Sequence, residues 1–151
     1  MLRKIFYTCI HFIKIGFSFF RSDDAYVSDK TMLLVDGEVD FCQLNANALE
    51  KQGFKVIVAH TLESAKFQLY AYNPTIILLN HKLPDGPGIE FLEKNKLVLE
   101  NKHVVFMTED SSIELRATSV KLGAFDILPK PFEPSALNKI VYLAANFAGH
   151  E

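Results

Sequence analysis

Buried-strand patterns and amphipathic-helix patterns alternate along most of this chain. Residues 75–80 give the clearest strand, because an uninterrupted aliphatic run ends at Asn80 and is followed by a Leu-Pro-Asp-Gly-Pro-Gly turn. Such a run is typical of a strand buried on both faces. Further strands are predicted over residues 31–35, 55–59, 104–107 and 124–128. Helical spacing predicts helices over residues 39–52, 62–72, 88–98 and 112–122, and from residue 134 onward.

Capping and turn residues support these boundaries. Gly53 and Gly123 follow the first and fourth predicted helices, where glycine commonly ends a helix. Thr61 is a typical N-cap for the second helix, which stops before Pro74. The side of the first helix that we expect to face the core carries Phe41, Leu44, Ala48 and Leu49.

Five strands alternate with five helices through short connections. This order favours right-handed crossovers and a parallel sheet with helices on both faces. We therefore predict an α/β fold with a five-stranded, doubly wound sheet in three layers, as in flavodoxin-like proteins. The glycine-rich motifs GxGxxG and GxxxxGK[ST] are absent from the sequence, which argues against dinucleotide binding and P-loop nucleotide binding.

Residues 1–21 form a basic amphipathic segment. Arg3, Lys4, Lys14 and Arg21 give it a charge of +4 without an acid, and most of its Phe and Ile residues fall on the opposite side of a helical projection. Lys14 disfavours a membrane-spanning helix, and no convincing signal-peptide cleavage site follows. Three interpretations stay open: a helix on an anionic membrane surface, a helix docked on another protein, or a translation start upstream of the true one.

The polar residues 22–30 have no periodicity and are predicted to be a linker, which leaves residues 31–148 as the folded domain. A chain of 151 residues with 49% hydrophobic composition suits one domain, so we expect no separate output domain within it. Two cysteines without metal-binding spacing suggest a reducing cytoplasm. We expect no nucleic-acid partner.

Four polar residues stand at the ends of predicted strands. Asp36, Asn80 and Thr108 end the first, third and fourth strands, and Lys130 follows the fifth. Because the carboxyl ends of parallel strands meet at one edge of the sheet, these side chains should converge on one crevice.

These motifs resemble the receiver domain of bacterial two-component response regulators over about residues 30–146. The matching pieces are Leu33-Leu-Val-Asp36, Ile76-Ile-Leu-Leu-Asn80, Leu83-Pro-Asp-Gly-Pro-Gly-Ile-Glu90, Val104-Val-Phe-Met-Thr108 and Gly123-Ala-Phe-Asp-Ile-Leu-Pro-Lys-Pro-Phe132. By the resemblance, the position of Asn80 is the one at which the family has an aspartate that accepts a phosphoryl group. The resemblance also implies Mg²⁺ held by two acids after the first strand, and phosphoryl contacts from Thr108 and Lys130.

The chain departs from this pattern at two positions, with Asn80 at the acceptor position and Gly37 where the second acid usually stands. A carboxamide carries no anionic oxygen to attack phosphorus, and Mg²⁺ prefers carboxylates. We therefore expect weak or absent Mg²⁺ binding with only Asp36 residual, and no catalytic residue or enzymatic activity. Glu38 and Glu109 are near in sequence, but we expect them to point elsewhere.

Without a metal, we expect Lys130 to pair with Asp36 and to hydrogen-bond the Asn80 amide. Thr108 has two equal interpretations, a ligand for a phosphoryl group or a strand-end residue bonded to the next turn. By the resemblance, Pro131 follows a cis peptide, and Ile127 replaces an aromatic residue of the family's switch. His81 is expected to be a plain surface residue.

The leading hypothesis is a pseudo-receiver, a single-domain module of phosphorelay signalling that acts by protein contact. By the resemblance, its contact face comprises residues 112–122, residues 124–128 and the last helix, with Ile127 and Phe132 as candidate contacts. A histidine kinase, another receiver, an output protein or a second copy would be the partner. The alternatives are a phosphotransfer-competent receiver that uses Asp85 or Glu38, and a flavodoxin-like cofactor binder. We expect a cytoplasmic location, with residues 1–21 as a contact to the inner membrane face.

Overall fold

The computed structural model describes residues 30–147 and contains one parallel sheet with the strand order β2-β1-β3-β6-β7. Its strands are β1 (Thr31–Val35), β2 (Lys55–Ala59), β3 (Ile76–Asn80), β6 (His103–Thr108) and β7 (Asp126–Pro129). The helices are α2 (Val39–Glu50), α3 (Leu62–Tyr72), α4 (Gly88–Lys94), α5 (Lys96–Leu99), α6 (Ile113–Lys121) and α7 (Pro134–Asn146). The predicted fold class is confirmed.

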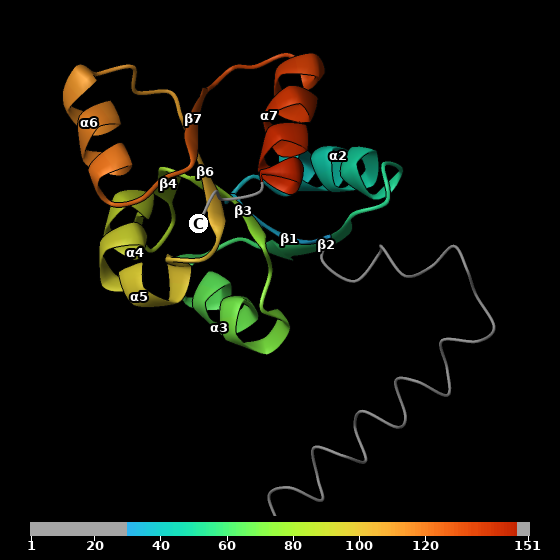
Figure 1. The fold of residues 1–151 in the computed structure, drawn as a ribbon, viewed down its shortest axis with the longest axis horizontal. Helices are drawn as coiled ribbons and strands as arrows, with labels where there is room; N and C mark the ends of the chain where they lie inside the picture. The colour runs from blue at the N-terminus through green and yellow to red at the C-terminus, as the bar shows by residue number, and fades with distance from the viewer. Residues whose placement is uncertain (1–29, 148–151) are drawn as a thin grey trace, which may run out of the picture.

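The sheet lies between two helical layers (Figure 1). Side chains alternate across a strand, so Met32 and Leu34 of β1 pack in the core beneath α2 and α7. Leu33 and Val35 pack in the opposite core, beneath α3, α4, α5 and α6. All five residues of β3 are buried, as expected for the central strand of a covered parallel sheet.

Strand register brings the carboxyl ends of the strands together. Val35 of β1 is paired with Leu79 of β3, and Asn80 is paired with Met107 of β6. Thr108 in turn is paired with Pro129 of β7. The residues that follow these positions therefore open onto one edge of the sheet, and the candidate site lies there.

Two helices differ from their predictions. The buried side of α2 carries Cys42, Ala46 and Leu49, whereas Leu44, which we expected in the core, is 72% exposed. The helix predicted over residues 88–98 is divided into α4 and α5 at Asn95. The buried Asn95 side chain donates a hydrogen bond to the carbonyl oxygen of Phe91 (2.9 Å), and such local side-chain bonds compete with helix continuation.

The loop after β3 contains a short hairpin that the sequence pattern did not predict. Its strands are β4 (Lys82–Leu83) and β5 (Gly86–Pro87), which pair antiparallel. The amphipathic segment 1–21 and the linker up to residue 29 lie outside the described residues. Among residues 30–147, no helix is both long and apolar enough to cross a membrane.

Gly88, at the start of α4, fixes how closely that helix approaches β3. A Cβ at this position would overlap the carbonyl oxygen of Asn80 and would lie 3.3 Å from the ring of Phe106. The Gly88 amide also donates to the carbonyl oxygen of His81 (2.6 Å). Only a glycine lets the backbone of α4 pack at this distance from the end of β3.

We expect Gly88→Ala to lower the free energy of unfolding by about 3 kcal/mol, because backbone atoms cannot yield to the added methyl group. Urea denaturation measures this change. Gly123→Ala is the matched control. Its added Cβ meets nothing within 4 Å, although its φ of +96° disfavours a side chain, so it should cost about 1 kcal/mol. Equal losses in the two variants would contradict the close-approach argument.

Candidate functional site

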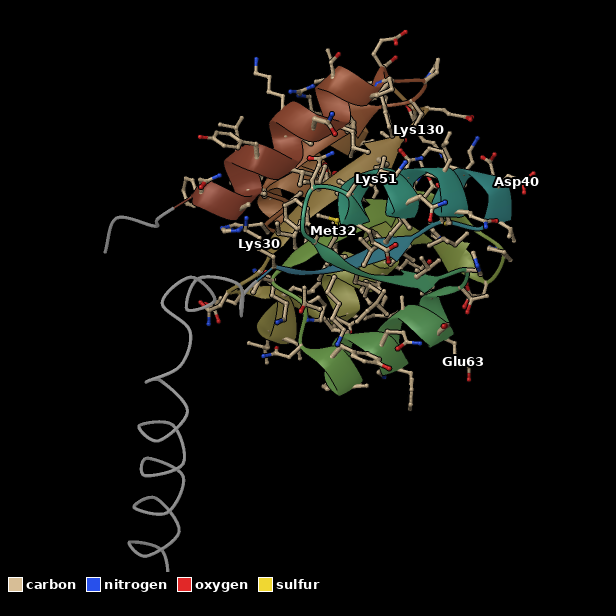
Figure 2. The ribbon with its side chains drawn as sticks, turned by 90° about the vertical axis from the view of Figure 1, so that its right-hand side faces the viewer. Lys30, Met32, Asp40, Lys51, Glu63 and Lys130 are labelled. Carbon is tan, nitrogen blue, oxygen red and sulfur yellow. The ribbon has the colours of Figure 1, made fainter. Side chains whose placement is uncertain are left out.

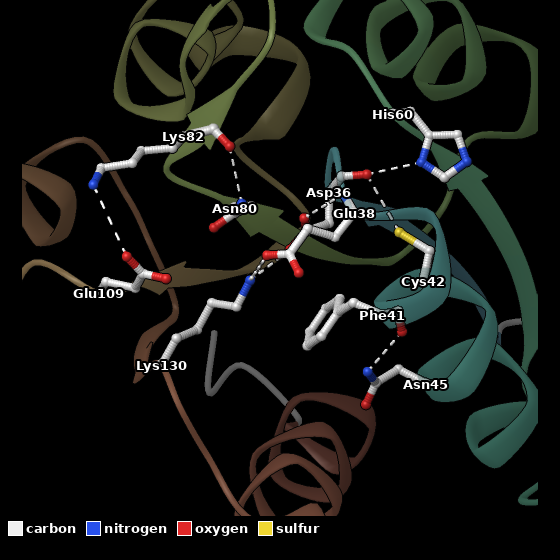
Figure 3. A network of polar contacts seen from close by, with 10 residues as sticks. All are labelled: Asp36, Glu38, Phe41, Cys42, Asn45, His60, Asn80, Lys82, Glu109 and Lys130. Carbon is white, nitrogen blue, oxygen red and sulfur yellow. Dashed lines mark hydrogen bonds and ion pairs between the residues drawn. The ribbon is translucent and has the colours of Figure 1, made fainter.

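Asp36, directly after β1, is the centre of a polar network at the carboxyl edge of the sheet (Figure 3). Its side chain is fully buried, and Oδ2 lies 2.8 Å from the Nζ atom of Lys130. Its Oδ1 accepts a hydrogen bond from the Glu38 amide (3.0 Å). The expected pairing of Lys130 with Asp36 is confirmed. Both carboxylate oxygens therefore have a partner within the chain.

Lys130 is held from several sides. Its side chain is 10% exposed, its Nζ lies 4.2 Å from the centre of the Phe41 ring, and its amide donates to the carbonyl oxygen of Thr108 (2.7 Å). The peptide bond between Lys130 and Pro131 is cis, which confirms that expectation. The ammonium group thus points from the end of β7 to the carboxylate that follows β1.

Asn80 does not make the contact that we expected. Its Nδ2 donates to the carbonyl oxygen of Lys82 (2.9 Å), two residues along the same loop, and no hydrogen bond joins Asn80 to Lys130 among the described contacts. The reason is local, because an asparagine side chain readily bonds to backbone two residues on. The amide is 8% exposed and lies at the wall of a cavity.

This cavity of about 310 Å³ is the space in front of β3. It is lined by Asp36, Gly37, Glu38, Asn80, His81, Lys82, Leu83, Pro84, Glu109 and Lys130. The expectation that Glu38 and Glu109 point elsewhere is wrong. Glu38 Oε1 lies 3.8 Å from the Nζ of Lys130, and Glu109 Oε2 lies 3.9 Å from the Nζ of Lys82. Three carboxylates therefore face two ammonium groups around the cavity.

Thr108 has a structural contact. Its Oγ1 accepts a hydrogen bond from the Asp110 amide (3.0 Å), which is the turn-bonding alternative of the sequence analysis. It is buried and lines a second cavity of about 60 Å³ together with Phe106, Ser119 and Ile127. Thr108 is not among the residues that line the larger cavity in front of Asn80.

His60 belongs to the network, although the sequence analysis missed it. Its Nδ1 lies 2.8 Å from the backbone carbonyl oxygen of Asp36, and the Cys42 thiol donates to the same oxygen (3.3 Å). Burial raises the pKa of Cys42 to about 11, and the negative charge of Asp36 adds to the effect, so the thiol stays protonated. The sequence did contain a signal for His60, because this residue directly follows β2, another strand that ends at this edge.

His81 is more buried than the surface position that we expected. Its ring lies 5.5 Å from that of Phe106, and its Nδ1 has no hydrogen-bond partner among the described residues. Desolvation lowers the pKa of His81, and the charge of Lys82 acts in the same direction, whereas Asp110 opposes it. The sequence after Asn80 therefore places an imidazole with a lowered pKa beside the cavity.

The comparisons with known proteins bear on this edge of the sheet. The sequence model of the response regulator receiver domain matches residues 32–142. The chain belongs to this family. Over 104 residues it is 33% identical to the photosynthetic apparatus regulatory protein RegA of Rhodobacter capsulatus. The matched residues make up 69% of this chain and 56% of RegA.

A second relative is the transcriptional regulatory protein CitB of Klebsiella pneumoniae, 35% identical over 103 residues that cover 67% of this chain and 44% of CitB. The chain thus spans about half the length of these curated relatives. Among solved structures, a CheY-like receiver domain protein from Methanospirillum hungatei superposes with a TM-score of 0.75 at 26% identity, covering 79% of this chain and 95% of that one. A two-component response regulator from Clostridium difficile gives a TM-score of 0.72 at 26% identity, covering 76% and 94%.

The receiver site of this chain does not suit the Mg²⁺ ion that the family resemblance implies. Both oxygens of Asp36 are engaged by Lys130 and by the Glu38 amide, Gly37 offers no side chain, and Asn80 offers a neutral amide. Within residues 30–147, no group of three or more His, Cys, Asp or Glu side chains is arranged to hold a metal ion. Glu38 and Glu109 also line the cavity, but they lie beside the ammonium groups of Lys130 and Lys82. Because hard divalent cations bind where several anionic oxygens are available, these residues do not fit the ion.

A double-mutant cycle tests the buried ion pair of this receiver. Lys130→Met alone should lower the free energy of unfolding by about 3–5 kcal/mol, because it leaves the Asp36 carboxylate buried without its cation. The double variant Asp36→Asn/Lys130→Met should lose less than the sum of the two single variants, with a coupling above about 1 kcal/mol. Denaturant titration of all four proteins gives the coupling.

The exposed pair of Lys82 and Glu109 is the control for this cycle. Its side chains are 78% and 65% exposed, so the coupling between Lys82→Met and Glu109→Gln should stay below about 0.5 kcal/mol. A coupling at the buried pair no larger than this would show that Lys130 does not neutralise Asp36.

Proposed function

We propose that this chain is a pseudo-receiver, a non-enzymatic module of two-component signalling that acts by protein contact and is not phosphorylated in the usual way. One observation carries the proposal: the residue at the end of β3 that faces the cavity is Asn80, a neutral amide. Formation of an acyl phosphate requires a carboxylate oxygen as the nucleophile. The amide nitrogen also donates to the Lys82 carbonyl, which turns it toward its own loop.

The charge balance around Lys130 supports the same proposal. In the family resemblance this ammonium contacts a phosphoryl group, but here it forms an ion pair with the buried Asp36 at 2.8 Å. The more exposed Glu38 lies on its other side at 3.8 Å. An incoming phosphoryl group would have to compete for Lys130 with the carboxylate of Asp36, which is shielded from water. The ammonium group of Lys130 is thus engaged by carboxylates of the chain itself.

For the contact face, we propose α6, β7 and α7, with a histidine kinase, another receiver or an output protein as the partner. Our two candidate contacts stay predictions, although neither side chain is fully exposed. Ile127 is 9% exposed and packs in the core beneath α6, and Phe132 is half-buried with its ring edge-on to Phe41 at 5.8 Å. Exposed apolar side chains of the flanking helices include Val120 of α6 and Tyr142 of α7, which are 58% and 67% exposed.

A second candidate function is phosphotransfer with Glu38 as a substitute acceptor. The observation that favours it is the position of Glu38, which lines the cavity and lies near Lys130. Asp85, the other substitute that we considered, is placed elsewhere. Its carboxylate accepts hydrogen bonds from the amides of Leu62 and Glu63 (2.8 and 3.0 Å) at the start of α3. Desolvation is the largest single effect on this carboxyl and raises its pKa, but the hydrogen bonds from the amides of Leu62, Glu63 and Asp85 together outweigh it, so the pKa of Asp85 is lowered. Membership of the receiver family removes the support for a flavodoxin-like cofactor binder.

A small phosphodonor tests the proposed function directly. The wild-type chain, incubated with acetyl phosphate and Mg²⁺, should gain no phosphoryl group by intact-protein mass spectrometry, because no anionic oxygen stands at the end of β3. Gly37→Asp/Asn80→Asp supplies both missing acids and should become phosphorylated.

Glu38→Gln separates the two candidate functions. If the wild-type chain is phosphorylated and Glu38→Gln is not, Glu38 is the acceptor and the pseudo-receiver proposal is wrong. A phosphoryl group on any other carboxylate of the wild-type chain would overturn both. The double variant is the positive control for the assay, since it shows that donor and metal reach the cavity.

Affinity capture from the native cell tests the contact face. Val120→Ser/Tyr142→Ser should reduce recovery of a kinase, receiver or output protein about tenfold, because exposed aromatic and aliphatic side chains at the centre of an interface dominate its affinity. Leu44→Ser on α2 is the control, with a side chain of similar exposure on a different helix. Equal recovery with the double variant and with the control would place the contact face elsewhere.

A further inference from the structure

Helix α3 carries an apolar stripe on its solvent side. Its residues line a shallow groove and are Glu63, Lys66, Phe67, Tyr70 and Ala71. The other four positions follow Glu63 by three, four, seven and eight residues, which places all five on one side of a helix. Phe67 is 70% exposed and Tyr70 is 60% exposed. Two neighbouring aromatic rings therefore face water along the middle of the helix.

The opposite side of α3 is already packed. Ala65 and Leu69 are buried in the core against the sheet. The helix is thus apolar on two sides, although only one of them has a partner among the described residues. Apolar residues all round a helix are typical of one that is covered on both sides. Because Glu63 and Lys66 have opposite charges, the stripe favours an apolar partner over a strongly charged one.

The described chain begins beside the carboxyl end of this helix. The Lys55 amide donates to the carbonyl oxygen of Lys30 (3.0 Å), and the Nζ of Lys55 lies 5.2 Å from the ring centre of Tyr72, the last residue of α3. In Figure 2, Glu63 marks the other end of α3, on the far side of the domain from Lys30. The described part of the chain therefore begins near the carboxyl end of α3.

The sequence before Lys30 contains a matching apolar pattern. Residues repeat at spacings of four and three in the order Phe6, Ile10, Ile13, Phe17 and Phe20. This is the spacing of a stripe that packs on another helix. The linker of residues 22–30 can extend roughly 30 Å, whereas the eleven residues of α3 span about 16 Å. The linker is therefore long enough to reach any part of the stripe.

We propose that residues 1–21 of this chain pack with their Phe and Ile side on the α3 stripe, next to Phe67 and Tyr70. The short linker gives the segment an effective concentration of about the millimolar range at the stripe, which a free partner would rarely match. Arg3, Lys4, Lys14 and Arg21 then face water. The inference is independent of the pseudo-receiver proposal, because none of these residues lines the cavity at Asn80.

Limited trypsin digestion of the full chain tests this packing. Trypsin cleaves after Lys14 and Arg21 only when the surrounding segment opens, so the cleavage rate reports the population of the undocked form. Phe67→Ser/Tyr70→Ser should increase the rate of cleavage after Lys14 about tenfold, measured by mass spectrometry of the released peptides. Ile113→Ser/Val120→Ser on α6 removes comparable exposed apolar side chains and should leave the rate unchanged. Thermal unfolding of both variants verifies that the domain stays folded.

The same digestion distinguishes the other occupants of the stripe. Protection that is constant across about a tenfold range of protein concentration, without lipid, supports packing within one chain. Protection that increases with protein concentration would instead assign the stripe to a second copy and overturn the proposal. Protection that occurs only with phosphatidylglycerol vesicles would assign residues 1–21 to a membrane surface. Equal cleavage rates in the wild-type chain and the α3 variant would also refute the packing of residues 1–21 on the stripe.

Discussion

The fully buried carboxylate of Asp36 is the constraint around which the polar edge of the sheet is arranged. An ion of this size costs several kcal/mol to remove from water, even after the protein relaxes. Lys130 supplies the opposite charge at 2.8 Å, and the Glu38 amide satisfies the second oxygen. The pair also joins two distant parts of the chain, because Asp36 follows β1 and Lys130 follows β7. Neutralising one charge thus holds the loop before α7 against the middle of the sheet.

The amide at position 80 is consistent with this charge balance. A carboxylate there would add a negative charge to a cavity whose wall already holds Asp36, Glu38 and Glu109. A bound divalent cation would relieve that repulsion in a phosphorylatable receiver. With Asn80, two ammonium groups face three carboxylates. Water can screen the charge of Glu38, the most exposed of the three. Asn80 thus avoids one further negative charge at this edge of the sheet.

The strands were predictable from the sequence because aliphatic runs between turn residues have few alternatives in a chain of this length. The convergence of Asp36, Asn80 and Lys130 followed from the parallel order alone, since it depends on backbone register and not on side-chain detail. The exposed side of α2 was not predictable, because apolar residues occur at many angles around that helix and only packing selects Cys42 over Leu44. The direction of the Asn80 amide depends on the loop conformation, which periodicity does not describe.

The fold of this receiver does not depend on an acid at position 80. The contacts of Asn80 that shape the edge are made by its backbone: β3 is paired with β6 there, and the carbonyl oxygen sets the close approach of Gly88. The side chain needs only to be polar and small enough to bond to its own loop. The helices therefore keep their positions on the sheet with an amide at this position. Because those helices carry the exposed apolar side chains, the surface available for protein contact does not depend on whether residue 80 is an acid or an amide.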